Sequence, residues 1–218
     1  MKKRLVIFDL DGTLADSLPA LEYCGNHALE KFGFPSFGRE CYKYFVGDGA
    51  ATLVERALKK AGDKDLEHFE EVFCEFLVMF KEYNMYQVEP YEGITELIQG
   101  LKKKGILLAV LSNKEHSQTI QVIETLFGKG TFDWIQGRMD GVEKKPSPEG
   151  VYQIEEGLKV MPEEVVYIGD TNTDMITGKS AGVYTVGVLW GFRDRAELEE
   201  YQADKIIEEP MELLSLFE

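Results

Sequence analysis

The sequence lacks long hydrophobic runs and paired cysteines, and each lack excludes a class of protein. No stretch approaches the roughly 18 apolar residues that span a bilayer, so we expect no transmembrane segment. The apolar run that begins the chain stops at Phe8, too short for the hydrophobic region of a secretion signal. Cys24, Cys41 and Cys74 lie far apart without C-x-x-C spacing. We therefore expect reduced thiols and a cytoplasmic protein.

Positive charge is also scarce. The chain has 24 lysines and arginines against 39 acidic residues, a formal net charge of −15. This balance argues against nucleic acid or an anionic membrane as partner. It still permits a small phosphorylated metabolite, provided that positive potential is built locally. At 218 residues, the chain is long enough for one α/β domain with a smaller insertion.

The first dozen residues carry the strongest pattern. The apolar run Leu5-Val-Ile-Phe8 predicts a buried parallel strand, and Asp9-Leu-Asp11-Gly-Thr13 follows it directly. Alternation along an extended chain places Asp9 and Asp11 on the same side, where they repel and need a cation or a proton. An ordinary Asp-Gly turn is the alternative. Thr13 either positions Asp11 through its hydroxyl or simply forms the turn.

Strand-like and helix-like segments alternate over most of the chain, which predicts a parallel sheet covered by helices. Residues 15–89 show no convincing strand, and we predict that they form an all-helical insertion between residues 1–14 and 90–218. Its clearest helical stripe has i, i+3, i+4, i+7 spacing and is typical of a bundle core: Phe69, Val72, Phe73, Phe76, Leu77 and Phe80. The sheet strands are predicted at 5–8, 106–111, 132–136, 165–169 and 184–189, and the helices between them at 117–126, 149–158 and 173–181.

Two further segments offer groups that can bind phosphate. Ser112-Asn113 follows the second strand, where a hydroxyl and a backbone N–H can hold a phosphate oxygen, although a helix cap is the common use of these residues. Lys145 precedes Pro146-Ser-Pro148, and the prolines fix the direction of its ammonium. The alternative is that Lys144 and Lys145 are both solvated.

A fourth segment, Gly169-Asp170-Thr-Asn-Thr-Asp174, follows another buried strand and offers oxygen ligands of the kind that Mg²⁺ prefers. A calcium loop is excluded, because its sixth position would be Met175 rather than glycine and its twelfth Ala181 rather than glutamate.

These four segments, in this order, resemble the motifs of the haloacid dehalogenase-like superfamily. The resemblance implies a Rossmann-like α/β core with strand order 5-4-1-2-3 and identifies the helical insertion as a C1 cap. It makes Asp9 the nucleophile that forms an aspartyl-phosphate and Asp11 the general acid and base. Ser112, Asn113 and Lys145 would bind the phosphate. Asp9, the Asp11 carbonyl and Asp170 would hold Mg²⁺, with Asp174 as an outer partner.

The closing stretch, with Val188-Leu-Trp-Gly-Phe-Arg193, is similar to the phosphoglycolate-phosphatase-like branch. An acid at Asp11 favours hydrolysis of a small phosphate monoester over dehalogenation. A β-phosphoglucomutase-like sugar phosphate mutase is the alternative, and a non-catalytic phospho-ligand sensor is a further one.

Substrate choice is expected to depend on the cap. The loop Gly47-Asp48-Gly49 resembles the cap loop that members of the superfamily point into the active site. Lys43 and Arg56, on either side of it, are candidates to bind the carboxylate of 2-phosphoglycolate, the favoured substrate, or else are solvated surface charges. Asp48 would oppose an anionic tail if it pointed inward. The oligomeric state cannot be read from the sequence.

Overall fold

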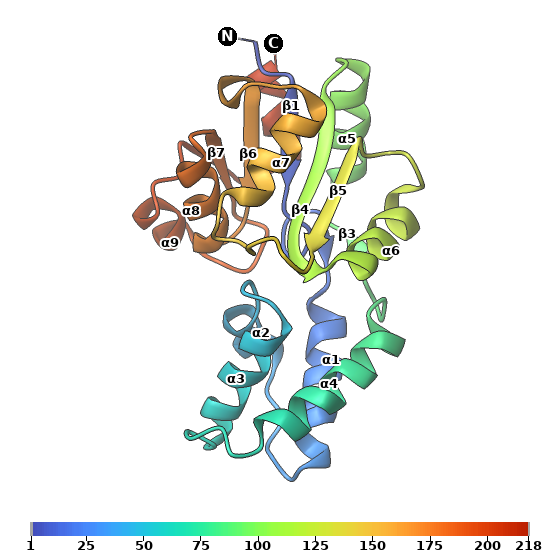
Figure 1. The fold of residues 1–218 in the computed structure, drawn as a ribbon, viewed down its shortest axis with the longest axis vertical. Coiled ribbons are helices and arrows are strands. Elements are labelled where there is room, and N and C mark those ends of the chain that lie inside the picture. Colours follow the sequence, from blue (N-terminus) through green and yellow to red (C-terminus); the bar gives the residue numbers. More distant parts are fainter. Residues whose placement is uncertain (1, 218) are drawn as a thin grey trace. The chain divides into compact units, whose positions relative to one another are not determined.

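A computed structural model describes residues 2–217. The chain forms two compact units (Figure 1). One contains Asp16–Glu89, and the other combines the chain up to Ala15 with the chain from Pro90 onward. The second unit holds the large sheet and is called the core unit below; the first is called the helical unit.

A parallel sheet is the centre of the core unit. In the described residues its strand order is β5-β4-β1-β6-β7-β8. If β1, β4, β5, β6 and β7 are numbered 1 to 5 along the chain, their order read from the β7 side is 5-4-1-2-3, as predicted. Strand β8 adds a sixth strand, beside β7, that we did not predict. The strands are β1 (Leu5–Phe8), β4 (Leu107–Glu115), β5 (Trp134–Arg138), β6 (Val165–Gly169), β7 (Tyr184–Val188) and β8 (Lys205–Ile207).

Strand β1 lies in the middle of this sheet, between β4 and β6. All four of its side chains are fully buried, which explains its unbroken apolar sequence. Phe8 is paired with Val110 of β4 and with Ile168 of β6. The residues that follow these three strands therefore leave the sheet at the same edge, where open α/β sheets bind their ligands.

Helices cover both faces of this sheet. Because parallel crossovers are right-handed, α5 and α6 lie on one face and α7 and α8 on the other; α7 and α8 lie in front of the sheet in Figure 1 and α5 behind it. The helical segments of the core unit are α5 (Ile94–Lys103), α6 (His116–Phe127), α7 (Glu149–Leu158), η1 (Pro162–Glu164), α8 (Asn172–Ala181), α9 (Arg195–Glu200) and η2 (Pro210–Phe217).

The helical unit contains α1 (Leu18–Lys31), α2 (Arg39–Phe45), α3 (Ala50–Ala61) and α4 (Phe69–Tyr83). Val72, Phe76 and Phe80 of α4 are buried, and the rings of Phe76 and Phe80 stack at 5.3 Å. Leu77, which the sequence placed in the buried stripe of this helix, is 43% exposed. The prediction is wrong there because Leu77 lies at the outer edge of the buried face.

Two short strands connect the units. Strand β2 (Ala15–Asp16) pairs with β3 (Glu89–Pro90), and the N–H of Tyr91 donates to the carbonyl of Leu14 at 3.2 Å. We expected no strand between residues 15 and 89. A two-residue strand has too little alternation to be recognised in a sequence.

Two expectations from composition concern the chain as a whole. Among residues 2–217, every helix is too short or too polar to cross a lipid bilayer. Cys24, Cys41 and Cys74 are all free thiols, and Cys24 is buried.

Candidate active site

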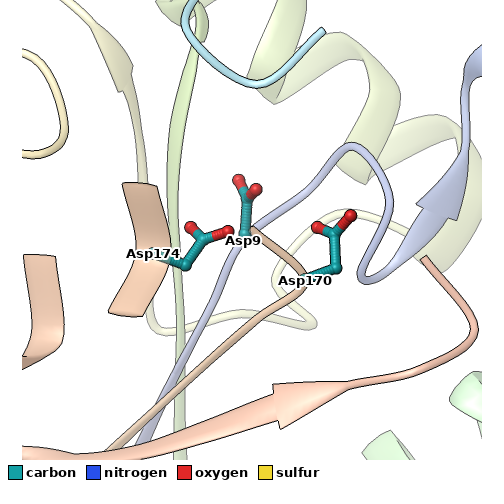
Figure 2. A group of neighbouring side chains, drawn as sticks. All are labelled: Asp9, Asp170 and Asp174. Carbon is teal, nitrogen blue, oxygen red and sulfur yellow. The ribbon is translucent and has the colours of Figure 1, made fainter. Parts of the chain in front are cut away.

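Three aspartates meet at the carboxyl edge of the sheet (Figure 2). Asp9 directly follows β1, Asp170 directly follows β6, and Asp174 lies in the first turn of α8. All three are buried, and one carboxylate oxygen of each lies within 4.8 Å of the others. Three acidic groups this close in a buried place require positive charge beside them.

Asp9 is held through one of its two oxygens. The N–H of Leu10 donates to its Oδ1 at 2.7 Å, and the Nζ of Lys145 lies 2.8 Å from the same atom. Both contacts are to Oδ1, so neither of them engages Oδ2. Burial and the charges of Asp174 and Asp170 raise the pKa of Asp9, whereas Lys145 acts in the opposite direction.

Lys145 supplies the positive charge between two of these acids. Its Nζ donates to Asp174 at 2.7 Å and its side chain is only 2% exposed. Burial alone would lower its pKa, but Asp174 and Asp9 outweigh burial and raise it. The ammonium therefore stays charged. Its neighbour Lys144 is exposed.

The backbone of Lys145 is fixed by Asn113. The Lys145 N–H donates to Oδ1 of Asn113 at 2.9 Å, and the Asn113 amide donates to the Lys145 carbonyl at 3.1 Å. The side chain of Asn113 thus positions the lysine. The backbone N–H of Lys114 donates to the Ser112 hydroxyl oxygen at 3.2 Å, which leaves the Ser112 O–H as a donor for a ligand.

Asp170 is held by two other segments. The Thr13 hydroxyl donates to its Oδ1 at 3.0 Å, and the N–H of Phe192 donates to its Oδ2 at 2.8 Å. Burial and the nearby charge of Asp174 raise the pKa of Asp170 to about 7. Thr13 therefore binds Asp170, rather than Asp11 as we considered from the sequence.

Two glycines leave space for the Asp170 side chain. Gly12 has a positive φ of 91°, and a Cβ there would overlap the Asp170 carboxylate and the Phe192 ring. A Cβ on Gly191 would overlap the Asp170 side chain and the Gly12 carbonyl. The backbone thus approaches the carboxylate more closely than any other residue type would allow.

Asp174 is saturated by protein donors. Its Oδ1 accepts from Lys145 and from the Tyr167 hydroxyl, at 2.7 and 3.3 Å. Its Oδ2 accepts from the N–H of Thr171 at 3.0 Å and from the Thr171 hydroxyl at 2.7 Å, which forms a capping box at the start of α8. These bonds fix both oxygens, as expected of a residue that orients its neighbours.

The site fits a divalent cation. Asp9 and Asp170 have raised pKa values, because each is buried beside other acids, and a cation would relieve this repulsion. Each oxygen of Asp170 accepts one hydrogen bond, from the Thr13 hydroxyl or from the Phe192 N–H, and keeps a further lone pair for a metal. A cluster of carboxylates with few other ligands suits Mg²⁺, which retains several water molecules.

Sequence reasoning missed one charged residue. Lys114, near the end of β4, places its Nζ 2.8 and 2.9 Å from the two carboxylate oxygens of Asp11, a residue 103 positions away. Its side chain is 3% exposed and that of Asp11 is 20% exposed. The signal in the sequence was its position immediately after Ser112-Asn113, at the same edge of the sheet as Asp11.

The candidate substrate-binding residues of the helical unit form their own network. Gly47 and Gly49, both with positive φ, lie between α2 and α3. Arg56 donates to Asp48 at 2.5 Å and to the Phe45 carbonyl at 3.2 Å, so it holds the loop between the two helices.

Lys43 pairs with an acid of its own helix, since its Nζ lies 3.0 Å from Glu40. Lys43 and Arg56 thus both have acidic partners inside the helical unit.

Comparisons with known proteins agree with this geometry. The family model of the haloacid dehalogenase-like hydrolases matches residues 6–188. A phosphoglycolate phosphatase of Aquifex aeolicus is 34% identical over 99% of this chain and 97% of its own length. A phosphoglycolate phosphatase from Neisseria meningitidis serogroup A is 33% identical over 92% of this chain and 86% of its own length. A solved structure, described as a predicted phosphoglycolate phosphatase from Haemophilus somnus, is 25% identical and has a TM-score of 0.92. The match covers 100% of this chain and 99% of that one.

Proposed function

The chain belongs to the haloacid dehalogenase-like hydrolase family, and on that premise we propose that it hydrolyses small phosphate monoesters, with 2-phosphoglycolate as the favoured substrate. The observation that carries this proposal is the position of Asp9. It lies at the carboxyl end of β1, with Lys145 at 2.8 Å and with Asp170 beside it. Phosphoryl transfer needs such a nucleophile in a place where negative charge is neutralised.

The proposed reaction has two steps. A carboxylate oxygen of Asp9 attacks phosphorus and the P–O bond of the ester breaks, while the Asp11 carboxyl gives its proton to the departing alcohol oxygen. Asp11 then takes a proton from water, and the water oxygen attacks the aspartyl-phosphate. This attack releases inorganic phosphate and restores Asp9. One residue can serve as acid and then as base because the first step leaves it deprotonated.

The positive groups of the site stabilise the transferring phosphoryl group. Lys145 neutralises charge on one side, and the Ser112 hydroxyl and the N–H groups near the end of β4 can hold its oxygens. We propose that Asp9, Asp170 and the backbone carbonyl of Asp11 hold Mg²⁺. Bound there, Mg²⁺ would neutralise charge on the phosphoryl oxygens. Asp174 would orient Lys145 and the start of α8.

The two units divide the work in this proposal. Residues 1–14 and 90–218 perform the chemistry, and residues 15–89 act as the cap that selects the substrate. The names of the relatives support 2-phosphoglycolate as that substrate. The loop held by Arg56 is the part of the cap proposed to contact it. Three free thiols and an acidic composition support a place in the cytoplasm.

A phosphate-release assay tests the proposal. The purified chain is incubated with 2-phosphoglycolate, hexose phosphates and an aryl phosphate, each with Mg²⁺ and with a chelator. We expect Mg²⁺-dependent release with the highest kcat/KM for 2-phosphoglycolate. Conversion of a hexose 1-phosphate to its 6-phosphate without phosphate release would contradict hydrolysis, and equal rates on every ester would contradict the substrate.

A further inference from the structure

Lys114 is a buried lysine that the mechanism above does not use. Its Nζ lies 2.8 Å from one oxygen of Asp11 and 2.9 Å from the other, so the ammonium faces the whole carboxylate. Lys145 is separate from this pair, because it contacts Asp9 and Asp174. The core unit therefore has one buried lysine beside the nucleophile and another beside the proposed acid.

We propose that Lys114 binds the carboxylate of 2-phosphoglycolate and so selects for that substrate; this inference rests on the proposed function. Asp11 must lie within one hydrogen-bond length of the ester oxygen that it protonates. Lys114 lies within one hydrogen-bond length of Asp11. The ester oxygen is thus within two such lengths of Nζ, or roughly 5–6 Å.

The chemistry of the substrate fits this distance. In 2-phosphoglycolate a single methylene group separates the ester oxygen from the carboxylate carbon. When the ester oxygen lies against Asp11, the carboxylate can therefore reach Lys114 for a charged hydrogen bond. The ammonium would then contact Asp11 on one side and the substrate carboxylate on the other, and would hold the ester oxygen towards its proton donor.

The other buried cations of the described chain contact other acids. Besides Lys114, residues 2–217 contain two buried basic side chains, Lys145 and Arg193. Lys145 contacts Asp9, whereas Arg193 pairs with Glu197 at 3.3 Å and its charge acts on Asp170. In the helical unit, Arg56 is used by Asp48 and the loop carbonyls. Lys114 is the cation whose contact places it on the side of the leaving group.

The experiment compares two substrates that differ in the group Lys114 would recognise. These are 2-phosphoglycolate and 2-hydroxyethyl phosphate, which replaces the carboxylate by a neutral alcohol. For Lys114→Met we expect kcat/KM to fall by about 10- to 100-fold more for 2-phosphoglycolate than for the neutral ester, mainly through KM. Any effect on Asp11 itself lowers both rates alike and cancels in the ratio.

Three further variants make the result decisive. Lys144→Met removes the same charge from an exposed position and should leave the ratio unchanged. Lys114→Arg keeps the charge and should keep most of the preference. If Lys114→Met does not fold, as judged by circular dichroism, Lys114→Gln removes the charge while retaining a donor to Asp11, and is measured in the same way.

The outcomes separate the two proposals. If the wild-type protein does not prefer 2-phosphoglycolate to the neutral ester, the proposed substrate is wrong and the assignment of Lys114 falls with it. If the wild type has the preference and the uncharged variants retain it, only the assignment of Lys114 is overturned. Lys114 would then be a positioning residue for Asp11.

Discussion

The Nζ atom of Lys145 lies 2.8 Å from Oδ1 of Asp9, although the two residues are far apart in the sequence. This contact connects the end of β1 to the segment before α7. It places a positive charge against the proposed nucleophile and engages only one of its two oxygens.

Asp9→Asn should abolish turnover, because an amide cannot form the aspartyl-phosphate. We expect a loss on the order of 10³-fold or more in kcat, with little change in the circular dichroism spectrum. The matched variant is Asp11→Asn, which keeps the nucleophile and should allow a slowly formed or persistent phosphoenzyme, detectable by mass spectrometry. Near-full activity of Asp9→Asn would refute the assignment of the nucleophile.

Removal of Asp170 should weaken Mg²⁺ dependence more than removal of Asp174. Both oxygens of Asp174 are already used by protein donors, whereas Asp170 retains lone pairs for a cation. For Asp170→Ala we expect the half-saturating Mg²⁺ concentration to rise by about 100-fold or more, and for Asp174→Ala by about tenfold. A Mg²⁺ titration of the rate measures both values. The opposite order would exchange the two roles.

Protons should compete with Mg²⁺ at Asp170. Its pKa in the metal-free protein is raised to about 7 by burial and by Asp174. Below that pH the carboxyl holds a proton that Mg²⁺ must displace, so half-saturating Mg²⁺ should rise by up to about tenfold for each pH unit. Magnesium titrations from pH 5.5 to 8.5 test this expectation, and a value independent of pH would contradict it.

Gly12→Ala should damage the site as well as the fold. The new methyl group would meet the Asp170 carboxylate, in addition to the cost of a positive φ. Gly105 is the matched control, because it also has a positive φ, of 71°, but a Cβ there has no neighbour within 4 Å. Both changes should cost about 1–2 kcal/mol through φ alone, and Gly12→Ala should in addition lose Mg²⁺-dependent activity. Equal activities of the two variants would show that Asp170 adapts.

Glu155 should make the protein less stable as the pH rises. This residue of α7 is buried, its Oε1 has no hydrogen-bond partner among the described residues, and burial with the nearby Glu163 raises its pKa to about 7. Between the unfolded pKa, near 4.5, and pH 7, the folded chain keeps a proton that the unfolded chain releases. The free energy of unfolding therefore falls over this range, and the full penalty applies above pH 7.

Glu155→Gln should remove this penalty. We expect it to match the wild type near pH 4.5 and to exceed its unfolding free energy by about 1–2 kcal/mol at pH 8, as measured by urea denaturation. Glu156→Gln, on the exposed side of the same helix, should show no such pH-dependent difference. A constant offset for Glu155→Gln at all pH values would mean that packing, rather than charge, is responsible.

Much of the core unit could be predicted because its strands are continuous apolar runs that end in polar residues. We predicted that strand β4 ends at Leu111, because Ser112, Asn113 and Lys114 have the composition of a loop. The strand instead continues to Glu115. These three residues are buried in the sheet because they form contacts across the site. Strand β8 was missed because three residues carry too little pattern.

The site was harder to predict where partners are distant in sequence. The hydroxyl of Thr13 reaches Asp170, 157 residues away, and Lys114 reaches Asp11 across 103 residues. A lysine after a strand usually points into solvent, so only its contact in three dimensions identifies it. The residues that follow the strands could be predicted, whereas their pairings depend on how β1, β4 and β6 are ordered side by side.

The pairing of β2 with β3 has a consequence for how this chain can change. Because the two ends of the helical unit are hydrogen-bonded to each other, the path of the core unit is nearly continuous across the insertion point. Segments whose ends lie together can be lengthened, shortened or exchanged with little disturbance to the rest of a fold. The 74 intervening positions, Asp16–Glu89, can therefore change while the aspartates and lysines of the core unit stay fixed. A chimera that carries the helical unit of another family member is a direct way to use this modularity.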